Sequence, residues 1–302
     1  MGFAIDKDVV EKYKKAGFIA GKALRYGAKL IKPGVSIVSV LDSVEEKIKE
    51  LGGGIAFPAQ ISLNHVAAHY CSVDENEVFK EGDVVKLDVG AHIDGFVGDT
   101  ALTVDLGDNK DLLSASRTAL KEAIKVVKSG TKVSDIGSVI HNTITSFGFA
   151  PVRNLSGHGL DKFQVHSEPN VPNYNNNSNY TLKNGQVIAI EPFSSSGVGI
   201  VEEVSTATVF SLERVKPVRN PTSRRILKEI ISFNGLPFTI RWFYKKYPRL
   251  LVDHAFNEFL RLGIVHDYRP LADVGKGLVA QFEHTMIVQE NKALVTTMVD
   301  DD

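Results

Sequence analysis

The chain has 302 residues, of which 43% are hydrophobic and 24% charged, a composition typical of a soluble globular protein. Its formal net charge of −1 excludes the strongly basic balance that is typical of DNA-binding and membrane-surface proteins. Cys71 is the only cysteine, so no internal disulfide bond can form, and no apolar run approaches the roughly 20 residues of a membrane span. These features predict a cytoplasmic protein with no membrane or DNA partner.

One pattern of residues occurs twice along the chain. From Lys32 to Gly52, apolar residues recur three or four positions apart, and like residues follow 96 positions later, from Lys128 to Gly148. Such spacing marks one face of a helix, and the two glycines lie where a helix would end. A further helix is expected before each copy, at about 7–31 and 110–127.

Two strand-like segments form a second repeat, and each of them ends in a carboxylate. Residues 81–88 and 184–191 both begin as a turn and continue as a β-branched run, which predicts a strand. The offset between them is 103 residues, so the intervening loops differ in length. Together the repeats predict two similar halves, each built as helix, helix and strands, with Asp88 and Glu191 at related positions.

Asp88 and Asp99 bracket a segment that reads as a hairpin, with Asp94-Gly95 as its turn signal. A turn centred between residues 93 and 94 would place the two aspartates directly opposite each other, with Cβ atoms about 4.5–5.5 Å apart. In such a pair, one aspartate often only caps a turn and the other faces solvent. Here both aspartates lie among apolar strand residues, where an unpaired charge is costly, and this context favours a metal site.

Three later residues are further candidates for metal ligands. His158 lies in a glycine-rich turn, Glu191 ends its apolar strand, and Glu283 lies inside another apolar strand. Taken singly, such a histidine is more often a loop residue, and such a glutamate is more often a salt-bridge partner. As a set with the aspartates, they provide the oxygen and nitrogen donors that divalent metals of intermediate hardness prefer.

The motifs around these candidates resemble those of methionine aminopeptidases, most closely the type 2 branch. The resemblance runs in family order from about residue 57 to the C-terminus, without the long charged N-terminal extension of some type 2 members. It is carried by Phe57-Pro58, Ser62-Leu63-Asn64, Ala67-Ala68-His69-Tyr70, Lys86-Leu87-Asp88-Val89-Gly90, Asp99, Gly157-His158-Gly159-Leu160, Val165-His166, Ala189-Ile190-Glu191-Pro192 and Gln281-Phe282-Glu283-His284-Thr285.

The resemblance implies the pita-bread fold of creatinases and aminopeptidases, an α/β (α+β) architecture whose pseudo-two-fold arrangement agrees with the repeats. Residues 1–212 and 273–302 would form the catalytic domain, and residues 213–272 a helical insertion. Two divalent metal ions per chain (cobalt, manganese, iron or zinc) would be held by five ligands. These ligands are Asp88, Asp99, His158, Glu191 and Glu283, of which Asp99 and Glu283 would bridge the two ions.

The activity implied is removal of the initiator methionine from nascent proteins and peptides when the next residue is small, by a monomeric enzyme. A metal-activated hydroxide would attack the first peptide bond. His69 and His166 would line the active site and assist catalysis without binding metal, and Glu191 would also carry a proton to the leaving amine. Phe57 would form part of the apolar pocket for the methionine side chain.

The segment 213–272 has its own composition, with 12 Lys or Arg residues against 5 Asp or Glu residues, an excess of 12 − 5 = +7. Helices are expected at about 222–233, 238–247 and 250–262. The run from Arg241 to Tyr247 mixes aromatic and basic side chains. It is typical either of a transient contact with ribosomal RNA or of a solvated basic face over an aromatic core.

Two other functions remain open at this stage. A proline-specific aminopeptidase or prolidase of the same fold shares the five-ligand site, although the contexts of His69 and Glu283 match those enzymes less well. A non-catalytic binding relative would typically have lost metal ligands, whereas all five positions are filled here.

Overall fold

A curved antiparallel sheet of eight strands forms the centre of the structure, a computed structural model that describes residues 3–298. The strand order is β1-β3-β4-β16-β8-β6-β7, and β17 also pairs with β16. The first three strands come from the first half of the chain and the rest from later segments, so the halves meet where β4 pairs with β16. The bounds are β1 (Gly54–Leu63), β3 (Val84–Ile93), β4 (Phe96–Asp105), β6 (Ser156–Asp161), β7 (Gln164–Pro172), β8 (Val187–Ile190), β16 (Glu283–Val288) and β17 (Ala293–Val295).

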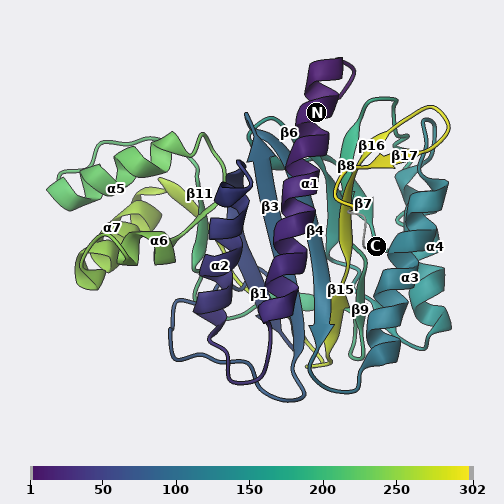
Figure 1. Ribbon diagram of the computed structural model, residues 1–302, viewed down its shortest axis with the longest axis horizontal. Helices are drawn as coiled ribbons and strands as arrows, with labels where there is room; N and C mark the ends of the chain where they lie inside the picture. Colours follow the sequence, from purple (N-terminus) through teal and green to yellow (C-terminus); the bar gives the residue numbers. More distant parts are fainter. Residues whose placement is uncertain (1–2, 299–302) are drawn as a thin grey trace.

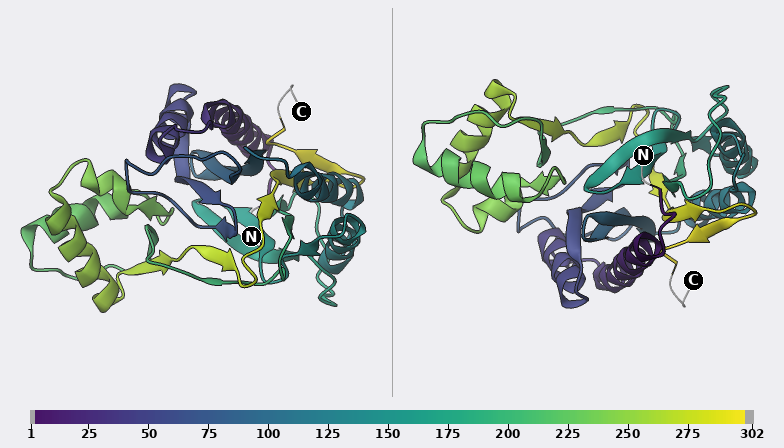
Figure 2. Two further views of the ribbon diagram at one scale, coloured as in Figure 1. Left: turned by 90° about the horizontal axis from the view of Figure 1, so that it is seen from below. Right: turned by 90° about the horizontal axis from the view of Figure 1, so that it is seen from above.

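Two pairs of helices cover the sheet, one pair beside each half (Figures 1 and 2). They are α1 (Lys7–Leu30), α2 (Ile37–Glu50), α3 (Lys110–Val126) and α4 (Val133–Ser146). The second helices of the two pairs have 14 residues each and begin 96 positions apart, as the repeat predicts. Gly52 and Gly148 follow them with φ of +81° and +84°, the left-handed conformation that ends many helices. The predicted helix pairs are therefore confirmed.

Each helix pair buries its apolar stripe against its own half of the sheet. Val44 and Ile48 of α2 pack with Leu87 of β3 in one cluster, and Ile140 of α4 packs with Ile188 of β8 in a second. All five side chains are fully buried. Burial of each such side chain contributes about 1.5–3 kcal/mol relative to exposure, so these stripes hold the helices onto the sheet. The expected two-half architecture is confirmed.

A separate group of helices extends to one side of the sheet (left in Figure 1). It consists of α5 (Pro221–Ser232), α6 (Ile240–Tyr244) and α7 (Arg249–Leu262). A three-stranded sheet joins it to the rest, in the order β12 (Phe238–Thr239), β11 (Val209–Leu212) and β13 (Val265–Tyr268). Its interior is aromatic, with Phe238, Phe243 and Phe256 in mutual ring contact.

The helix expected at 238–247 is shorter than predicted. Phe238 and Thr239 pair with β11 as a strand, and the helix begins only at Ile240, with the Thr239 side chain accepting a hydrogen bond from the Arg241 amide. Pairing with a distant strand has overridden the local helical pattern, which the sequence could not reveal. The aromatic and basic run also does not form one exposed patch, because Arg241 and Phe243 are buried.

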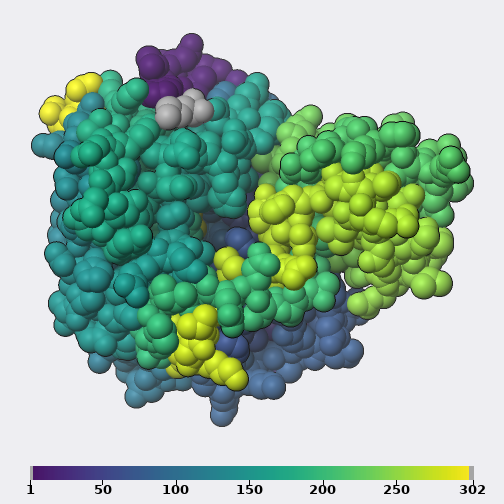
Figure 3. Space-filling view, turned by 180° about the vertical axis from the view of Figure 1, so that it is seen from behind, coloured from purple at the N-terminus to yellow at the C-terminus, as the bar shows by residue number. Residues whose placement is uncertain are grey.

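Six short strands form two further three-stranded sheets. Their orders are β10 (Val201–Glu203), β14 (Leu271–Asp273), β2 (Val66–Ala68) and β15 (Val279–Gln281), β9 (Phe193–Ser195), β5 (Ala150–Pro151). Seen from behind, the molecule has a hollow between the teal second half and the yellow segment near the C-terminus (Figure 3). None of the helices within residues 3–298 has the length and apolar character that a bilayer-crossing segment requires.

Candidate metal centre

The β3–β4 hairpin carries the two aspartates, but in a different register from the one expected. Asp94 and Gly95 have φ of +53° and +90°, which makes them the two central residues of a tight hairpin turn. The turn is therefore centred one residue later than expected. Asp99 pairs with Gly90, and Asp88 pairs with the residue two positions beyond Asp99. The two carboxylates are diagonal neighbours on one face, and the prediction that they lie directly opposite each other is wrong.

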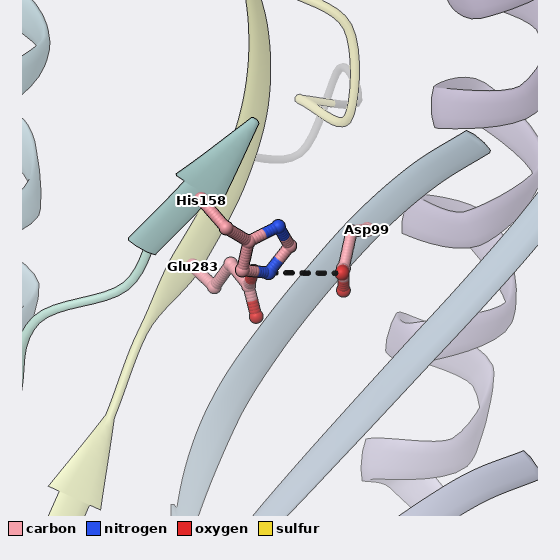
Figure 4. Close-up of side chains that lie close together, drawn as sticks. All are labelled: Asp99, His158 and Glu283. Carbon is pink, nitrogen blue, oxygen red and sulfur yellow. Dashed lines mark ion pairs between the residues drawn. The ribbon is translucent and has the colours of Figure 1, made fainter. Parts of the chain in front are cut away.

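Three further side chains reach the same place from the second half of the chain. His158 lies within the strand β6, so the glycine-rich turn expected for it is wrong; Glu283 begins β16, and Glu191 directly follows β8. The His158 Nε2 atom lies 3.7 Å from Asp99 Oδ2 and 3.6 Å from Glu191 Oε1. Ligand atoms of Asp99, His158 and Glu283 all lie within 4.8 Å of one another, and Figure 4 shows these side chains converging from three strands. The structure thus brings all five predicted residues around one cavity.

Burial makes this group of carboxylates electrostatically unfavourable on its own. Removal from water raises the pKa of Asp88 to about 7. Burial, and then repulsion from neighbouring carboxylates, raises the pKa values of three others well above their usual range: Asp99, Glu191 and Glu283. The four groups cannot all be ionised near neutral pH unless a cation compensates their charge.

His158 is oriented to act as a ligand. Burial, and then the neighbouring His166, lowers the pKa of His158 to about 3, so its ring is neutral at pH 7. Its Nδ1 atom lies 3.2 Å from the Gly159 carbonyl oxygen, which can only accept a hydrogen bond. Nδ1 must therefore carry the proton, and Nε2 presents a lone pair to the carboxylates. A lone pair facing carboxylate oxygens is favourable only with a cation between them.

The unpaired atoms of the cluster also fit a divalent cation. Within residues 3–298, three buried carboxylate oxygens of the cluster have no hydrogen-bond partner: Asp88 Oδ1, Asp99 Oδ1 and Glu283 Oε1. Orphaned buried acceptors of this kind cost free energy unless something binds them. Carboxylate oxygens combined with one imidazole suit manganese, iron, cobalt or zinc better than a soft metal such as Cu(I).

Two threonine-mediated contacts fix the two halves of the chain against each other at this point. Thr285 of β16 donates from its hydroxyl to the Asp99 carbonyl and accepts from the Asp99 amide, at 2.8 and 2.9 Å. Thr100 of β4 donates to the Glu283 carbonyl at 2.8 Å. These bonds hold Asp99 and Glu283, which come from different halves, at a fixed separation.

Gln281 belongs to the site, although sequence reasoning gave it no role of its own. Its side-chain amide donates to Glu191 Oε2 at 3.3 Å and to Glu283 Oε2 at 3.4 Å. It is 1% exposed and lies two residues before Glu283 on an extended segment. That spacing places both side chains on one face, so the signal was present in the Gln-Phe-Glu run.

A cavity of about 250 Å³ opens beside the carboxylates, and its remaining wall combines apolar side chains with polar ones such as Gln60, Asn154 and Asn170. Phe57 lies in this wall, on β1, where it pairs with Gly90. Other apolar residues in the wall were not identified from the sequence: Leu155, Phe193, Val209, Pro237 and Tyr268. They come from distant parts of the chain and carry no shared motif.

His69 and His166 also line this cavity. Burial lowers the pKa of His69 to about 4 and also lowers the pKa of His166, so both rings are neutral at pH 7. The centroids of the His166 and His158 rings lie 4.5 Å apart. The His69 ring makes an edge contact with the Tyr268 ring, with a centroid separation of 5.7 Å. Neutral imidazoles at this position can donate a hydrogen bond to a ligand in the cavity.

Comparison with known proteins decides which family this site belongs to. Residues 11–290 match metallopeptidase family M24. The chain belongs to this family. Its sequence is 46% identical over 295 residues to the methionine aminopeptidase of Archaeoglobus fulgidus. The match covers 97% of this chain and 100% of that protein.

Two solved structures show the same architecture. The methionine aminopeptidase of Thermotoga maritima is 28% identical, with a TM-score of 0.74, and the match covers 99% of this chain and 100% of that chain. A prolidase from Pyrococcus furiosus is 20% identical, with a TM-score of 0.64 over 98% of this chain and 65% of that chain, and so shares the fold alone. The expected pita-bread fold is confirmed. As a member of M24, the chain is a metal-dependent peptidase.

Proposed function

We propose that this M24 peptidase removes the N-terminal methionine from nascent proteins and peptides when the next residue is small. One observation carries the proposal: four carboxylates and a neutral histidine, of which Asp99, Glu283 and His158 are buried, line a cavity whose wall also carries several apolar side chains. The carboxylates and the histidine suit metal-assisted hydrolysis, and the apolar side chains suit an uncharged substrate side chain. The methionine aminopeptidases that the chain resembles over nearly its full length support the same conclusion.

In this proposal, two divalent ions are held by Asp88, Asp99, His158, Glu191 and Glu283. When bound, such ions supply Lewis acidity and activate water for attack on a carbonyl group. Asp99 of the first half and Glu283 of the second half lie close together where β4 pairs with β16, and both would be shared by the two ions. Glu191 would also take the proton released during attack and pass it to the leaving amine.

The two histidines that are not ligands in this proposal would position the substrate. His69 and His166 each present a neutral ring to the cavity and can donate to the carbonyl oxygen, where negative charge develops during attack. Phe57 is one of the apolar side chains in the cavity wall, where the methionine side chain would bind. Selection by an apolar wall discriminates by about 1–3 kcal/mol per methylene group, so related apolar residues would be cut slowly.

We assign the chain to the type 2 branch because α5, α6 and α7 lie between β11 and β13, as in the helical insertion of that branch. In this division, residues 213–272 form the insertion, and residues 1–212 and 273–302 form the catalytic domain of a monomer.

Three basic side chains lie exposed along one face of α5: Arg224, Arg225 and Lys228. We propose a transient contact between this face and ribosomal RNA, for which co-sedimentation with ribosomes should weaken steeply as salt rises. Absent or salt-insensitive co-sedimentation contradicts the contact.

Cleavage of Met-Ala-Ser and Ala-Pro-Ala by the manganese- or cobalt-loaded protein, together with metal analysis, tests the main proposal. We expect release of methionine from the first peptide and little cleavage of the second. Preferred cleavage of Ala-Pro-Ala would identify a proline-specific peptidase instead. Full metal occupancy without hydrolysis of either peptide would identify a non-catalytic relative.

A further inference from the structure

A buried ionic contact joins the helical segment 221–262 to the helix α2 of the catalytic domain. Arg241 of α6 donates from Nη1 to Asp42 and from Nη2 to Glu45 at 2.5 Å, and both acceptors lie on α2. The Trp242 indole donates to the second Glu45 oxygen at 2.8 Å, and Lys245 donates to the second Asp42 oxygen. We call these five residues the Arg241 clasp. All four carboxylate oxygens of the clasp are therefore used.

The centre of the clasp is removed from water. The Arg241 side chain is 3% exposed and the Glu45 side chain 6%, whereas Asp42 is 34% and Lys245 50% exposed. A buried ion pair of this kind adds little net stability, but loss of one partner leaves an uncompensated buried charge. The effect of the Arg241 clasp is therefore to hold α6 and α2 in one relative position.

Beside the clasp, α6 and α2 are not in close contact, although Leu236 and the strand β12 attach the same segment to other parts of the catalytic domain. A cavity of about 820 Å³ separates α2 from residues 232–246 beside the clasp, so close packing does not fix this spacing. Among residues 3–298, the ion pairs between 221–262 and the rest of the chain are those of the clasp. The helix α6 itself has only five residues and depends on tertiary contacts for its position.

The clasp is connected to the active-site cavity through the small sheet. Thr239, two residues before Arg241, pairs with Val209, and Val209 pairs with Tyr268. These three residues form one row across β12, β11 and β13, with neighbouring strands about 4.8 Å apart. Val209 and Tyr268 line the active-site cavity, and Tyr268 contacts the His69 ring. A displacement of α6 therefore moves the wall of the cavity through backbone hydrogen bonds.

We propose that Arg241 is a positioning residue, which fixes the Val209–Tyr268 wall of the substrate cavity by anchoring α6 to Asp42 and Glu45. The inference rests on the proposed function only in that the cavity binds the peptide substrate. Arg241 contacts neither the carboxylate cluster nor the cavity. Its loss changes substrate binding and leaves the metal content as it was.

Graded substitutions test the clasp. Glu45→Gln keeps the side-chain shape but has only one acceptor oxygen for two donors, and Asp42→Asn does the same at the more exposed position. Arg241→Met removes the guanidinium and keeps the apolar stem. Lys246→Met is the matched control, because its ion pair with Glu229 lies wholly within the helical group.

Steady-state kinetics with Met-Ala-Ser should separate positioning from stability. We expect Arg241→Met to raise KM by roughly 10- to 100-fold, with kcat changed far less, since a changed fit of the substrate to an apolar wall alters binding by that order. Glu45→Gln should raise KM less, Asp42→Asn least, and Lys246→Met should leave it unchanged. If Arg241→Met does not fold, the order of the two carboxylate variants and the control decides the question.

Two readouts do not depend on activity. Trp242 is the only tryptophan, so its emission and its quenching by acrylamide report directly whether the clasp has opened. Hydrogen exchange of residues 209–212 and 265–268 should quicken in the clasp variants and not in the control. Lower melting temperatures with unchanged KM and unchanged exchange in these strands would overturn the inference. If the unaltered protein fails to cleave Met-Ala-Ser, the proposed function fails, and hydrogen exchange still decides the role of Arg241.

Discussion

The close pairing of Phe57 with Gly90 allows the substrate cavity to be perturbed without touching a metal donor. A Cβ atom added at Gly90 would lie 2.1 Å from Cε1 and 2.5 Å from Cδ1 of the Phe57 ring. Carbon atoms in contact normally lie about 3.5–4.0 Å apart, so Gly90→Ala must displace the ring by roughly 1 Å or more. Phe57 is 4% exposed and packs against Leu160 and Val165, so the open direction is the cavity of about 250 Å³.

The size of the effect follows from this displacement. Taking up about one methylene of space in an apolar pocket costs about 1–3 kcal/mol of transition-state binding, or roughly 10- to 200-fold in kcat/KM for Met-Ala-Ser. Overpacking should also lower the free energy of unfolding by about 1–3 kcal/mol. Metal content should not change, because alanine offers no donor atom and the substitution alters no ligand.

Peptide kinetics, metal analysis and thermal unfolding of Gly90→Ala, Phe57→Leu and the double variant form the assay. Leucine lacks the ring atoms that the new Cβ would meet, so the double variant should regain part of the activity lost in Gly90→Ala. The double-mutant cycle measures this coupling directly. Normal kcat/KM in Gly90→Ala, or a double variant whose losses simply add, would refute the assignment of Phe57 to the substrate pocket.

Three further predictions concern the metal centre. Asp99→Ala should abolish turnover and weaken metal binding, and normal activity at normal metal content would contradict its role as a ligand. Gln281→Leu removes the amide that donates to two of the carboxylates, so it should weaken metal affinity by roughly 10- to 100-fold, as competition with a chelator would show. An affinity within error of the unaltered protein would exclude that role. Removal of the metal with a chelator should make stability depend on pH. Burial raises the pKa of Asp88 from 3.8 to about 7, so the contribution of protonated Asp88 to the free energy of unfolding is fully present below pH 4 and is lost as pH rises toward 7. The melting temperature of the chelated protein should therefore fall between about pH 4 and 7 and recover with added Mn²⁺, whereas a flat profile would count against a cation-dependent carboxylate cluster.

The sequence alone was sufficient to predict the elements whose signals are local. The helix pairs follow from apolar spacing and from glycines at the helix ends, and α2 and α4 begin 96 residues apart as the repeat requires. The second repeat, with its offset of 103 residues, indicated two halves with carboxylates on related strands, although Asp88 lies within β3 and only Glu191 follows the end of its strand. Short-range periodicity determines which face of a helix is buried, so these features need no knowledge of distant contacts.

Other features depend on the exact conformation of a turn or on pairing with a distant strand. The hairpin register followed from the conformations of Asp94 and Gly95, and a shift of one residue placed Asp88 and Asp99 diagonally rather than opposite each other. The segment 238–239 became a strand because β11 was available to pair with it. Tyr268 has no local signal at all, since its place in the cavity wall is determined by the strand beside it.

The sequence by itself determined which side chains are available for chemistry: four acidic residues in apolar surroundings, one histidine between two glycines, and two more histidines. Only the tertiary structure decided that they meet around one cavity, because β4 and β16 come from opposite halves of the chain and are joined by Thr285 and Thr100. It also decided that Gln281 faces two of the carboxylates and that Arg241 points inward. The physical reason is that burial and proximity, which set the charge state of these groups, arise only when segments nearly 200 residues apart pack together.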